Sequence, residues 1–213
     1  MKKVNYEKRS IHISKRIFDL VGACVGMLIL GLSFIPVALA IKLTSKGPIF
    51  YKQLRVGRWT PDKMDFIHVL KYRTMYIDAE ARTGATWATE NDPRITPVGR
   101  FLRKTRLDEL PQFINVLRGD MSLIGPRPER PDFYSKLERD IPFFVERTYD
   151  VLPGITGLAQ VNQGYDTCIE DVRSKVGYDH SYALSLSSFK TWLLTDLHIV
   201  FKTLKIMVDG RGR

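Results

Sequence analysis

The sequence predicts an α/β protein that is mostly helical, with a small β-hairpin and a long apolar helix near its N-terminus. Three observations support this class: an uncharged apolar run at 20–41, two strand-like segments around a polar turn, and helical spacing of apolar residues over 189–208. We therefore divide the chain into an N-terminal basic segment with a membrane helix (1–46) and a compact domain (47–213).

The apolar run contains 22 residues without a charged side chain. As a helix it would be about 33 Å long, which is enough to cross a bilayer. It is too long for the apolar core of a signal peptide, and no small-residue cleavage pattern follows it. The run therefore predicts a helix that stays in the membrane.

Pro36 interrupts this run, with Ser33 three residues before it. Proline removes a backbone donor and clashes with the preceding turn, so we expect a kink or break, with the Ser33 hydroxyl binding the carbonyls freed near residues 32 and 33. Six basic residues precede the run and five follow it closely, whereas a spanning helix usually has an excess on one side. This favours a re-entrant helix–break–helix hairpin over the alternative, a kinked spanning helix.

The compact domain begins with two predicted strands, KGPIFYKQLRVGR and FIHVLKYRTM, joined by a turn with Pro61 and Asp62. Residues 78–100 predict a short helix followed by a loop. Thr105 predicts the capped start of an amphipathic helix, which tolerates Pro111 near its N-terminus. The C-terminal helix combines apolar residues with lysines, so it could pack on the core or lie in a lipid headgroup layer.

The charge balance favours a polyanionic partner. Lys and Arg number 33 and Asp and Glu number 23, which gives a net charge of +10. The two cysteines are far apart in sequence, the four histidines lack metal-ligand spacing, and no P-loop or nucleophile-elbow motif occurs. Disulfide frameworks, zinc modules, P-loop NTPases and serine hydrolases are therefore disfavoured.

Asp108 and Glu109 form the strongest chemical candidate, because they follow three basic residues at a predicted helix start. Cations and a helix N-terminus favour an ionised carboxylate, which could hold a divalent cation or attack phosphorus. Simple N-capping by a surface acid is the alternative.

Further candidates carry positive charge. Arg127 lies between two prolines, which restrict the backbone and present a guanidinium suited to phosphate, although a plain turn would also explain the prolines. Lys71 and Arg73 would share one strand face and are candidate ligands for phosphate or lipid headgroups. Asp179 and Gln160 are possible further site residues.

Five segments in order along the chain carry a family resemblance: KRIFDL, GPIFYKQLRVG, KYRTM, LDELPQFINVLRGDMSLIGPRP and PGITGLAQVN. Over residues 15 to 205 the chain resembles the monotopic phosphoglycosyl transferases, a family of bacterial sugar transferases. The resemblance implies a catalytic domain on the cytoplasmic face of the bacterial inner membrane. It further implies an N-terminal membrane helix that enters and leaves the bilayer on that same side. It also implies transfer of a sugar 1-phosphate from a UDP-sugar to polyprenol (undecaprenyl) phosphate, with Mg²⁺ and release of UMP, as the first step of glycan assembly.

The resemblance also implies residue roles. Asp108 would be the nucleophile that forms a phosphosugar-aspartyl intermediate and the candidate Mg²⁺ ligand, with Glu109 beside it as a second catalytic residue. Arg103 and Arg127 match phosphate-binding positions. Expected partners are a UDP-sugar, polyprenol phosphate and membrane lipids, with a homodimer possible and no nucleic acid. Arg106 departs from the pattern, since relatives often have Ser there.

Two other functions remain open from the residues alone. A membrane-anchored binder of anionic lipid or nucleic acid would explain the net charge but not the conjunction of LDELPQ with GPRP. A membrane phosphohydrolase would use the same aspartate and transfer the phosphoryl group to water. Dependence on an acceptor lipid distinguishes it from a transferase.

Overall fold

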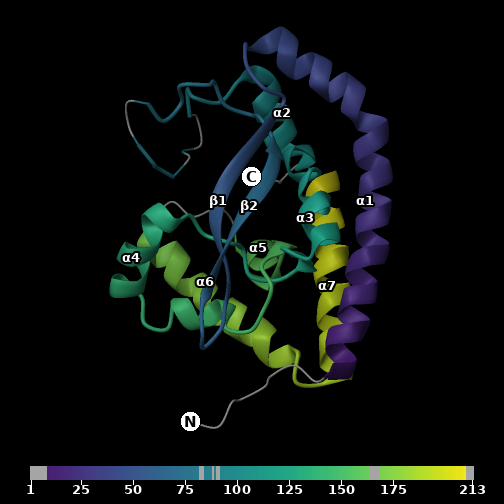
Figure 1. Cartoon of the computed structure of the whole chain (residues 1–213), viewed down its shortest axis with the longest axis vertical. Helices are drawn as coiled ribbons and strands as arrows, with labels where there is room; N and C mark the ends of the chain where they lie inside the picture. The colour runs from purple at the N-terminus through teal and green to yellow at the C-terminus, as the bar shows by residue number, and fades with distance from the viewer. Residues whose placement is uncertain (1–8, 82–83, 88, 90–91, 164–167, 210–213) are drawn as a thin grey trace.

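The computed structural model describes residues 9–81, 84–87, 89, 92–163 and 168–209. A central antiparallel hairpin is flanked on one side by the long first helix and on the other by α4 and α6 (Figure 1). The elements are, in order, α1 (Arg9–Thr44), β1 (Phe50–Trp59), β2 (Met64–Tyr72), α2 (Pro97–Lys104), the 3₁₀ turn η1 (Leu107–Glu109), α3 (Gln112–Arg118), β3 (Ser122–Ile124), α4 (Pro131–Asp140), the 3₁₀ turn η2 (Val145–Thr148), β4 (Gly154–Thr156), α5 (Leu158–Asn162), α6 (Ile169–Ser185) and α7 (Phe189–Val208).

Helix α1 is one continuous helix of 36 residues with Pro36 inside it. The break expected at Pro36 is therefore wrong: the helix bends over one end of the domain without ending (Figure 1). Proline removes a single donor, and bending relieves its clash, so the hydrogen bonds on either side can persist. The Ser33 hydroxyl donates to the carbonyls of Ile29 (2.7 Å) and Leu30 (3.3 Å), and not to those of residues 32 and 33 as expected.

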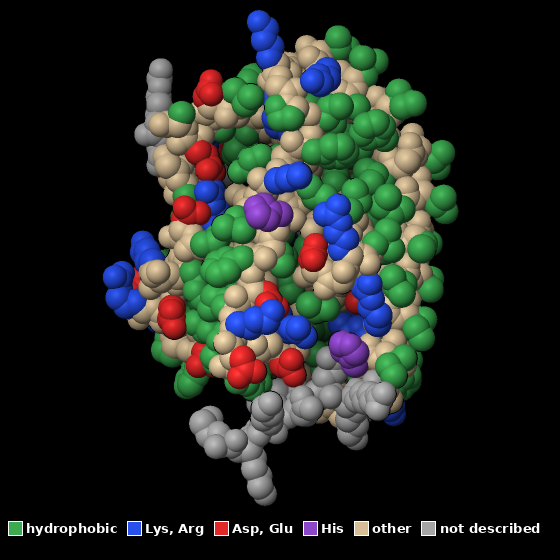
Figure 2. All heavy atoms as spheres, viewed as in Figure 1, with side chains coloured by type: hydrophobic (Ala, Val, Ile, Leu, Met, Phe, Trp, Pro, Cys, Tyr) green, Lys and Arg blue, Asp and Glu red, His purple; other side chains and the backbone are tan. Residues whose placement is uncertain are grey.

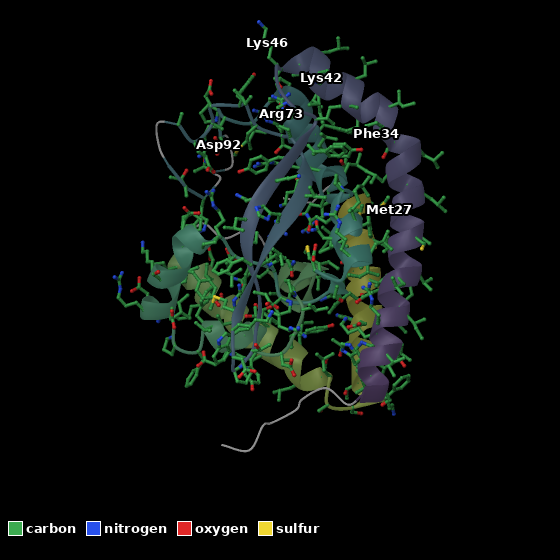
Figure 3. The ribbon with its side chains drawn as sticks, viewed as in Figure 1. Met27, Phe34, Lys42, Lys46, Arg73 and Asp92 are labelled. Carbon is green, nitrogen blue, oxygen red and sulfur yellow. The ribbon has the colours of Figure 1, made fainter. Side chains whose placement is uncertain are left out.

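One face of α1 packs closely on the domain. A Cβ atom at Gly22 would lie 2.4 Å from Leu123, and one at Gly26 would lie 2.4 Å from the Phe113 ring. These two glycines therefore let the helix backbone approach β3 and α3. Met27 lies on the same inner side (Figure 3) and packs against a buried cluster of α1, hairpin and α2 residues.

A buried polar network fixes the N-terminal half of α1. The Lys15 ammonium donates to the carbonyl of Ile124 (3.0 Å) and to Asp196 of α7 (3.2 Å). Asp19 accepts hydrogen bonds from Ser122 and from the backbone of Leu123, each at 2.9 Å. Helix α1 thus holds β3, the strand that leads directly into the Gly-Pro-Arg-Pro turn.

The predicted hairpin is confirmed. Strands β1 and β2 pair antiparallel, with Tyr51 opposite Lys71, and the turn closes with a bond from the Thr60 N–H to the Lys63 carbonyl at 2.9 Å. A second sheet, the parallel pair β3 and β4, was not predicted. Its strands have three residues each, too few for periodicity to identify.

Two sequence-based boundaries are wrong. Residues 78–81 form a turn and not a helix, and α2 begins at Pro97. Thr105 ends α2 and does not cap a new helix, because Arg106 adopts a left-handed conformation (φ 56°) that reverses the chain. The predicted C-terminal helix is confirmed as α7, whose inner face lies in the core with Trp192 and whose outer face exposes Phe201.

Candidate active site

The Asp-Glu pair lies in the short turn η1 between α2 and α3. The left-handed Arg106 ends the preceding turn, and Pro111 occupies the N-cap of α3. The chain reverses within a few residues and turns both carboxylates inward, where Asp108 is 8% and Glu109 6% exposed. Simple N-capping by a surface acid does not describe this geometry, since both side chains are buried and neither is an N-cap residue.

Glu109 is surrounded by cations from three parts of the chain. Its Oε1 lies 3.3 Å from Lys71 Nζ of β2 and 3.0 Å from Nη2 of Arg127, and its Oε2 lies 3.8 Å from Nη1 of Arg106. Burial alone would raise the pKa of Glu109, but the charges of Arg127, Lys71 and Arg106 outweigh it and hold that pKa well below its usual range. Glu109 is therefore a permanent anion that gathers these cations.

Asp108 has a different environment. Burial, followed by the charge of neighbouring Glu109, raises the pKa of Asp108 to about 6, against the opposing charges of Lys71, Arg103 and Arg127. In the described part of the chain, no cation lies within ion-pair distance of its carboxylate. Of the two adjacent acids, Glu109 therefore has three cation partners. Asp108 has no ion-pair partner among the described residues, and its pKa lies just below neutral pH.

The surrounding cations are themselves partly buried. Burial lowers the pKa of Lys71 to about 8, with the charge of Glu109 acting in the opposite direction. Arg103 donates from Nε to the Thr74 hydroxyl (2.9 Å), and its charge acts on Asp108. The structure therefore brings together Asp108, Glu109, Lys71, Arg103 and Arg127, five of the residues singled out from the sequence.

Arg73 does not join this cluster. Its guanidinium donates to the carbonyls of Lys46 and, at 2.8 Å, Ser45, just beyond the end of α1 (Figure 3). Strand β2 ends at Tyr72, so the alternation of side chains that paired Lys71 with Arg73 does not extend to residue 73. The two candidate ligands therefore contact different groups: Lys71 contacts Glu109, and Arg73 holds the loop between α1 and β1.

Asp179 and Gln160 lie close to the cluster, behind Arg127. Together with Arg127 they line one cavity. Arg147 connects the two regions: its Nη1 donates to Asp179 (2.8 Å) and its Nη2 to the carbonyl of Arg127 (3.0 Å). Burial raises the pKa of Asp179 against the charge of Arg147. This buried pair supports the backbone that presents Arg127.

Sequence reasoning missed four residues of this region: Arg55, Arg106, Gln112 and Arg147. Arg106 and Gln112 belong to the stretch already singled out around Asp108, so their proximity to the acids was the available signal. Arg55 lies within the segment GPIFYKQLRVG, but the sequence of this strand does not indicate which of its side chains face the carboxylates. Arg147 has no local signature.

The described residues contain no group of three or more His, Cys, Asp or Glu side chains that could hold a metal ion. A single carboxylate still suits Mg²⁺, which is commonly held by one or two carboxylates, water and substrate phosphates. Asp108 fits this requirement because its carboxylate has no cation partner among the described side chains.

The buried carboxylate pair is thus surrounded by Lys and Arg, and the same chain has one helix long and apolar enough to cross a membrane. Converging cations of this kind are typical of sites that bind phosphate or carboxylate groups. Comparison with known proteins specifies the class of protein. The model of the bacterial sugar transferase family matches residues 10–210, and the chain belongs to this family.

Several curated relatives are similar to the chain. A UDP-N-acetylgalactosamine-undecaprenyl-phosphate N-acetylgalactosaminephosphotransferase of Aeromonas hydrophila is 42% identical over 198 residues, covering 93% of this chain and 44% of the relative. A UDP-glucose:undecaprenyl-phosphate glucose-1-phosphate transferase of Escherichia coli (strain K12) is 40% identical over 193 residues, covering 89% and 39%. A putative undecaprenyl-phosphate N-acetylgalactosaminyl 1-phosphate transferase of Bacillus subtilis (strain 168) is 49% identical over 135 residues, covering 62% and 72%. The chain thus spans less than half the length of the first two.

Proposed function

We propose that this chain transfers a sugar 1-phosphate from a UDP-sugar to undecaprenyl phosphate and releases UMP, which starts assembly of a bacterial surface glycan. The relatives named above act on undecaprenyl phosphate, and two of them on UDP-sugars. The observation that carries the proposal is the contrast between the two acids, since an unpaired carboxylate beside a permanently ionised, cation-bound one is arranged for nucleophilic attack on a phosphoryl group.

In the proposed reaction, a carboxylate oxygen of Asp108 attacks the phosphorus that bears the sugar. The bond from that phosphorus to the bridging oxygen breaks, and UMP leaves with the electron pair. An oxygen of undecaprenyl phosphate then attacks the same phosphorus and restores the Asp108 carboxylate. No proton has to move in either step, because both nucleophiles are anions above their pKa values.

The other residues would bind and orient the phosphates. Arg127 and Lys71, held in place by Glu109, would bind phosphoryl oxygens from one side, and Arg103 would approach from α2. Preorganised cations stabilise the charge that develops in the transition state without having to reorganise. Mg²⁺, held by Asp108 together with the donor diphosphate, would supply further charge neutralisation.

We propose a monotopic placement for α1, in which it enters and leaves the cytoplasmic leaflet of the inner membrane. One face of the helix is buried against the domain at Ala23, Leu30 and Ile41, and the opposite face is exposed along its whole length (Figure 2). A helix crossing the bilayer would carry the packed domain into hydrocarbon. The exposed apolar face consists of Ile13, Ile17, Val21, Val25, Leu28, Leu32, Ile35, Leu39 and Leu43.

The most exposed residues of this face are Leu32 (85%) and Ile35 (74%) near Pro36, together with Leu43 (79%) near the end of the helix. Lys42 and Lys46 lie toward the other end of the bend (Figure 3), where they can reach lipid phosphates. The bent helix would then place its apex deepest in the lipid. The exposed outer face of α7, with Phe201 and Leu204, would lie in the headgroup layer.

The experiment that tests the proposed function is a panel of UDP-sugars assayed for UMP release with Mg²⁺, with and without undecaprenyl phosphate. Formation of a lipid-linked sugar phosphate with one donor is the expected result. UMP release that continues without acceptor and yields free sugar phosphate would identify a phosphohydrolase. Absence of release with every donor would favour a binding protein.

A further inference from the structure

A second cavity lies beside the Asp-Glu pair, between the hairpin, the start of α3 and the Gly-Pro-Arg-Pro turn. It is lined by Arg55, Val69, Lys71, Gln112, Arg127 and Pro128. Three of these six residues are cations, and they come from β1, β2 and the turn after β3. Such a converging set of charges favours an anionic group.

Gln112 supplies an independent indication of a ligand. The residue is 1% exposed, and its amide nitrogen Nε2 is buried with no hydrogen-bond partner. Buried polar groups almost always have a partner, and an acceptor bound in the cavity that Gln112 lines would satisfy this donor. Glu109 contacts Lys71, Arg127 and Arg106 but not Gln112, so it does not satisfy the Gln112 amide.

Arg55 is held rigidly at this cavity. Its Nε and Nη2 donate to the side-chain oxygen of Gln53 (3.0 and 2.5 Å), and its Nη1 donates to the carbonyl of Pro128 (3.0 Å). Glu129 is its ion-pair partner at a longer 3.9 Å. The three hydrogen bonds fix this partly buried guanidinium through neutral groups, and its one carboxylate partner among the described residues lies at the longer distance.

Lys71 and Arg127 face both the Asp-Glu pair and this cavity. Each has a contact with Oε1 of Glu109, and each also lines the cavity. Two phosphates that share a bridging oxygen need adjacent binding sites, and two shared cations between neighbouring sites meet that need. The geometry suits a diphosphate that lies across Lys71 and Arg127.

We infer that this cavity is a second phosphate subsite, in which Arg55 and Gln112 bind the phosphate that stays on the nucleotide when Asp108 attacks the sugar-bearing phosphorus. The inference rests on the proposed function for the identity of the ligand. The acceptor lipid also carries a phosphate, so the same chemistry could come from undecaprenyl phosphate, and the test separates the two sources.

The test measures binding of UMP and of uridine to the full chain in detergent by calorimetry, without any donor sugar. For Gln112→Met and Arg55→Met we expect UMP binding at least about tenfold weaker, because each variant removes a hydrogen bond to a charged group, and uridine binding unchanged. Lys52→Met, which removes an exposed cation from the same strand, is the matched control and should bind UMP as the wild type does.

Two outcomes would overturn the inference. Unchanged UMP binding in both variants together with a raised KM for undecaprenyl phosphate would overturn the nucleotide assignment and place the acceptor there. If neither ligand is affected in variants that unfold at the wild-type temperature, the subsite is refuted. Should Gln112→Met fail to fold, Gln112→Glu keeps the side-chain size and must weaken UMP binding by repulsion.

Failure of the proposed function has a different signature. A wild-type chain that releases no UMP from any UDP-sugar, but whose binding of UMP still depends on Gln112 and Arg55, would retain the subsite and lose the transferase activity. Full turnover together with UMP binding that is insensitive to both residues would support the proposed activity and refute the subsite.

Discussion

Nη2 of Arg127 lies 3.0 Å from Oε1 of Glu109, which joins the turn after β3 to the turn that carries Asp108. The same oxygen receives Lys71. One buried anion therefore sets the position of two cations next to an acid that has no cation of its own among the described residues.

Glu109→Gln should abolish UMP release and lower the thermal unfolding temperature. The change leaves the partly buried cations Lys71, Arg127 and Arg106 around a neutral amide, and breaking a buried ion pair costs about 3–5 kcal/mol. Thermal unfolding and UMP release measure the two effects. Glu138→Gln, at an exposed site on α4, should change neither. A stable and fully active Glu109→Gln variant would show that the cations do not depend on this carboxylate.

Asp108→Asn should abolish UMP release without loss of stability. Burial and the adjacent charge of Glu109 disfavour the ionised form of Asp108, so a neutral amide of similar size removes an unfavourable charge at pH 7.5. We expect an unfolding temperature equal to or slightly above that of the wild type. Undiminished turnover would reject Asp108 as the nucleophile.

The pH dependence of kcat/KM should be bell-shaped. The raised pKa of Asp108 means that its carboxylate is protonated and unreactive below about pH 6, so activity rises through that pH. The lowered pKa of Lys71 means that it loses its charge above about pH 8, so activity falls there. Lys71→Arg, which cannot deprotonate in this range, should extend activity to higher pH. An unchanged alkaline limb in that variant would exclude Lys71 as its source.

Arg73→Met should act on stability and not on catalysis. It removes charge-assisted hydrogen bonds to the carbonyls of Ser45 and Lys46, at a cost of about 1.5–3 kcal/mol each. Because Arg73 lies apart from the Asp108 cluster, kcat/KM of the folded variant should stay within a few-fold of the wild type. Arg103→Met should instead lower kcat/KM and leave the unfolding temperature nearly unchanged. Unfolding temperature and UMP release are measured for both variants. A catalytic defect without loss of stability in Arg73→Met would show that Arg73 acts in the active site.

Leu32→Glu should release the chain from membranes. The residue is 85% exposed on the apolar face of α1, and a carboxylate there opposes insertion into hydrocarbon. Phe66→Glu, at an exposed apolar residue of β2, is the matched control and should remain membrane-bound. The readout is sedimentation with vesicles.

The monotopic placement makes a separate prediction about the chain ends. Tags at residues 1 and 213 should both resist protease added to intact cells, since a helix that enters and leaves one leaflet keeps both ends on the cytoplasmic side. Cleavage of one tag would identify a spanning helix.

Elements with strong periodicity or clear turn chemistry were predictable from the sequence. The hairpin around Pro61 and the helix over 189–208 are confirmed for this reason. The continuity of α1 through Pro36 was not predictable, because packing against the domain and bending together decide whether a proline ends a helix. Likewise, the left-handed conformation of Arg106 has no sequence signal, and it reverses the chain just after Thr105 ends α2, where a helix was predicted to begin.

The candidate site shows the same division. The resemblance to sugar transferases singled out Asp108, Glu109, Arg103 and Arg127, which the fold brings together. Gln112 and Arg55 were missed because their role depends on which side chains line one cavity, and residues of β1, β2 and the start of α3 come together there. Only three-dimensional packing shows this arrangement.

The most direct measurement is mass spectrometry of the chain after brief incubation with a UDP-sugar donor and Mg²⁺ in the absence of acceptor. We predict a sugar-phosphate adduct on the peptide that contains Asp108, which disappears when undecaprenyl phosphate is added. An adduct on any other side chain, or none with a donor that supports turnover, would contradict covalent transfer through this carboxylate.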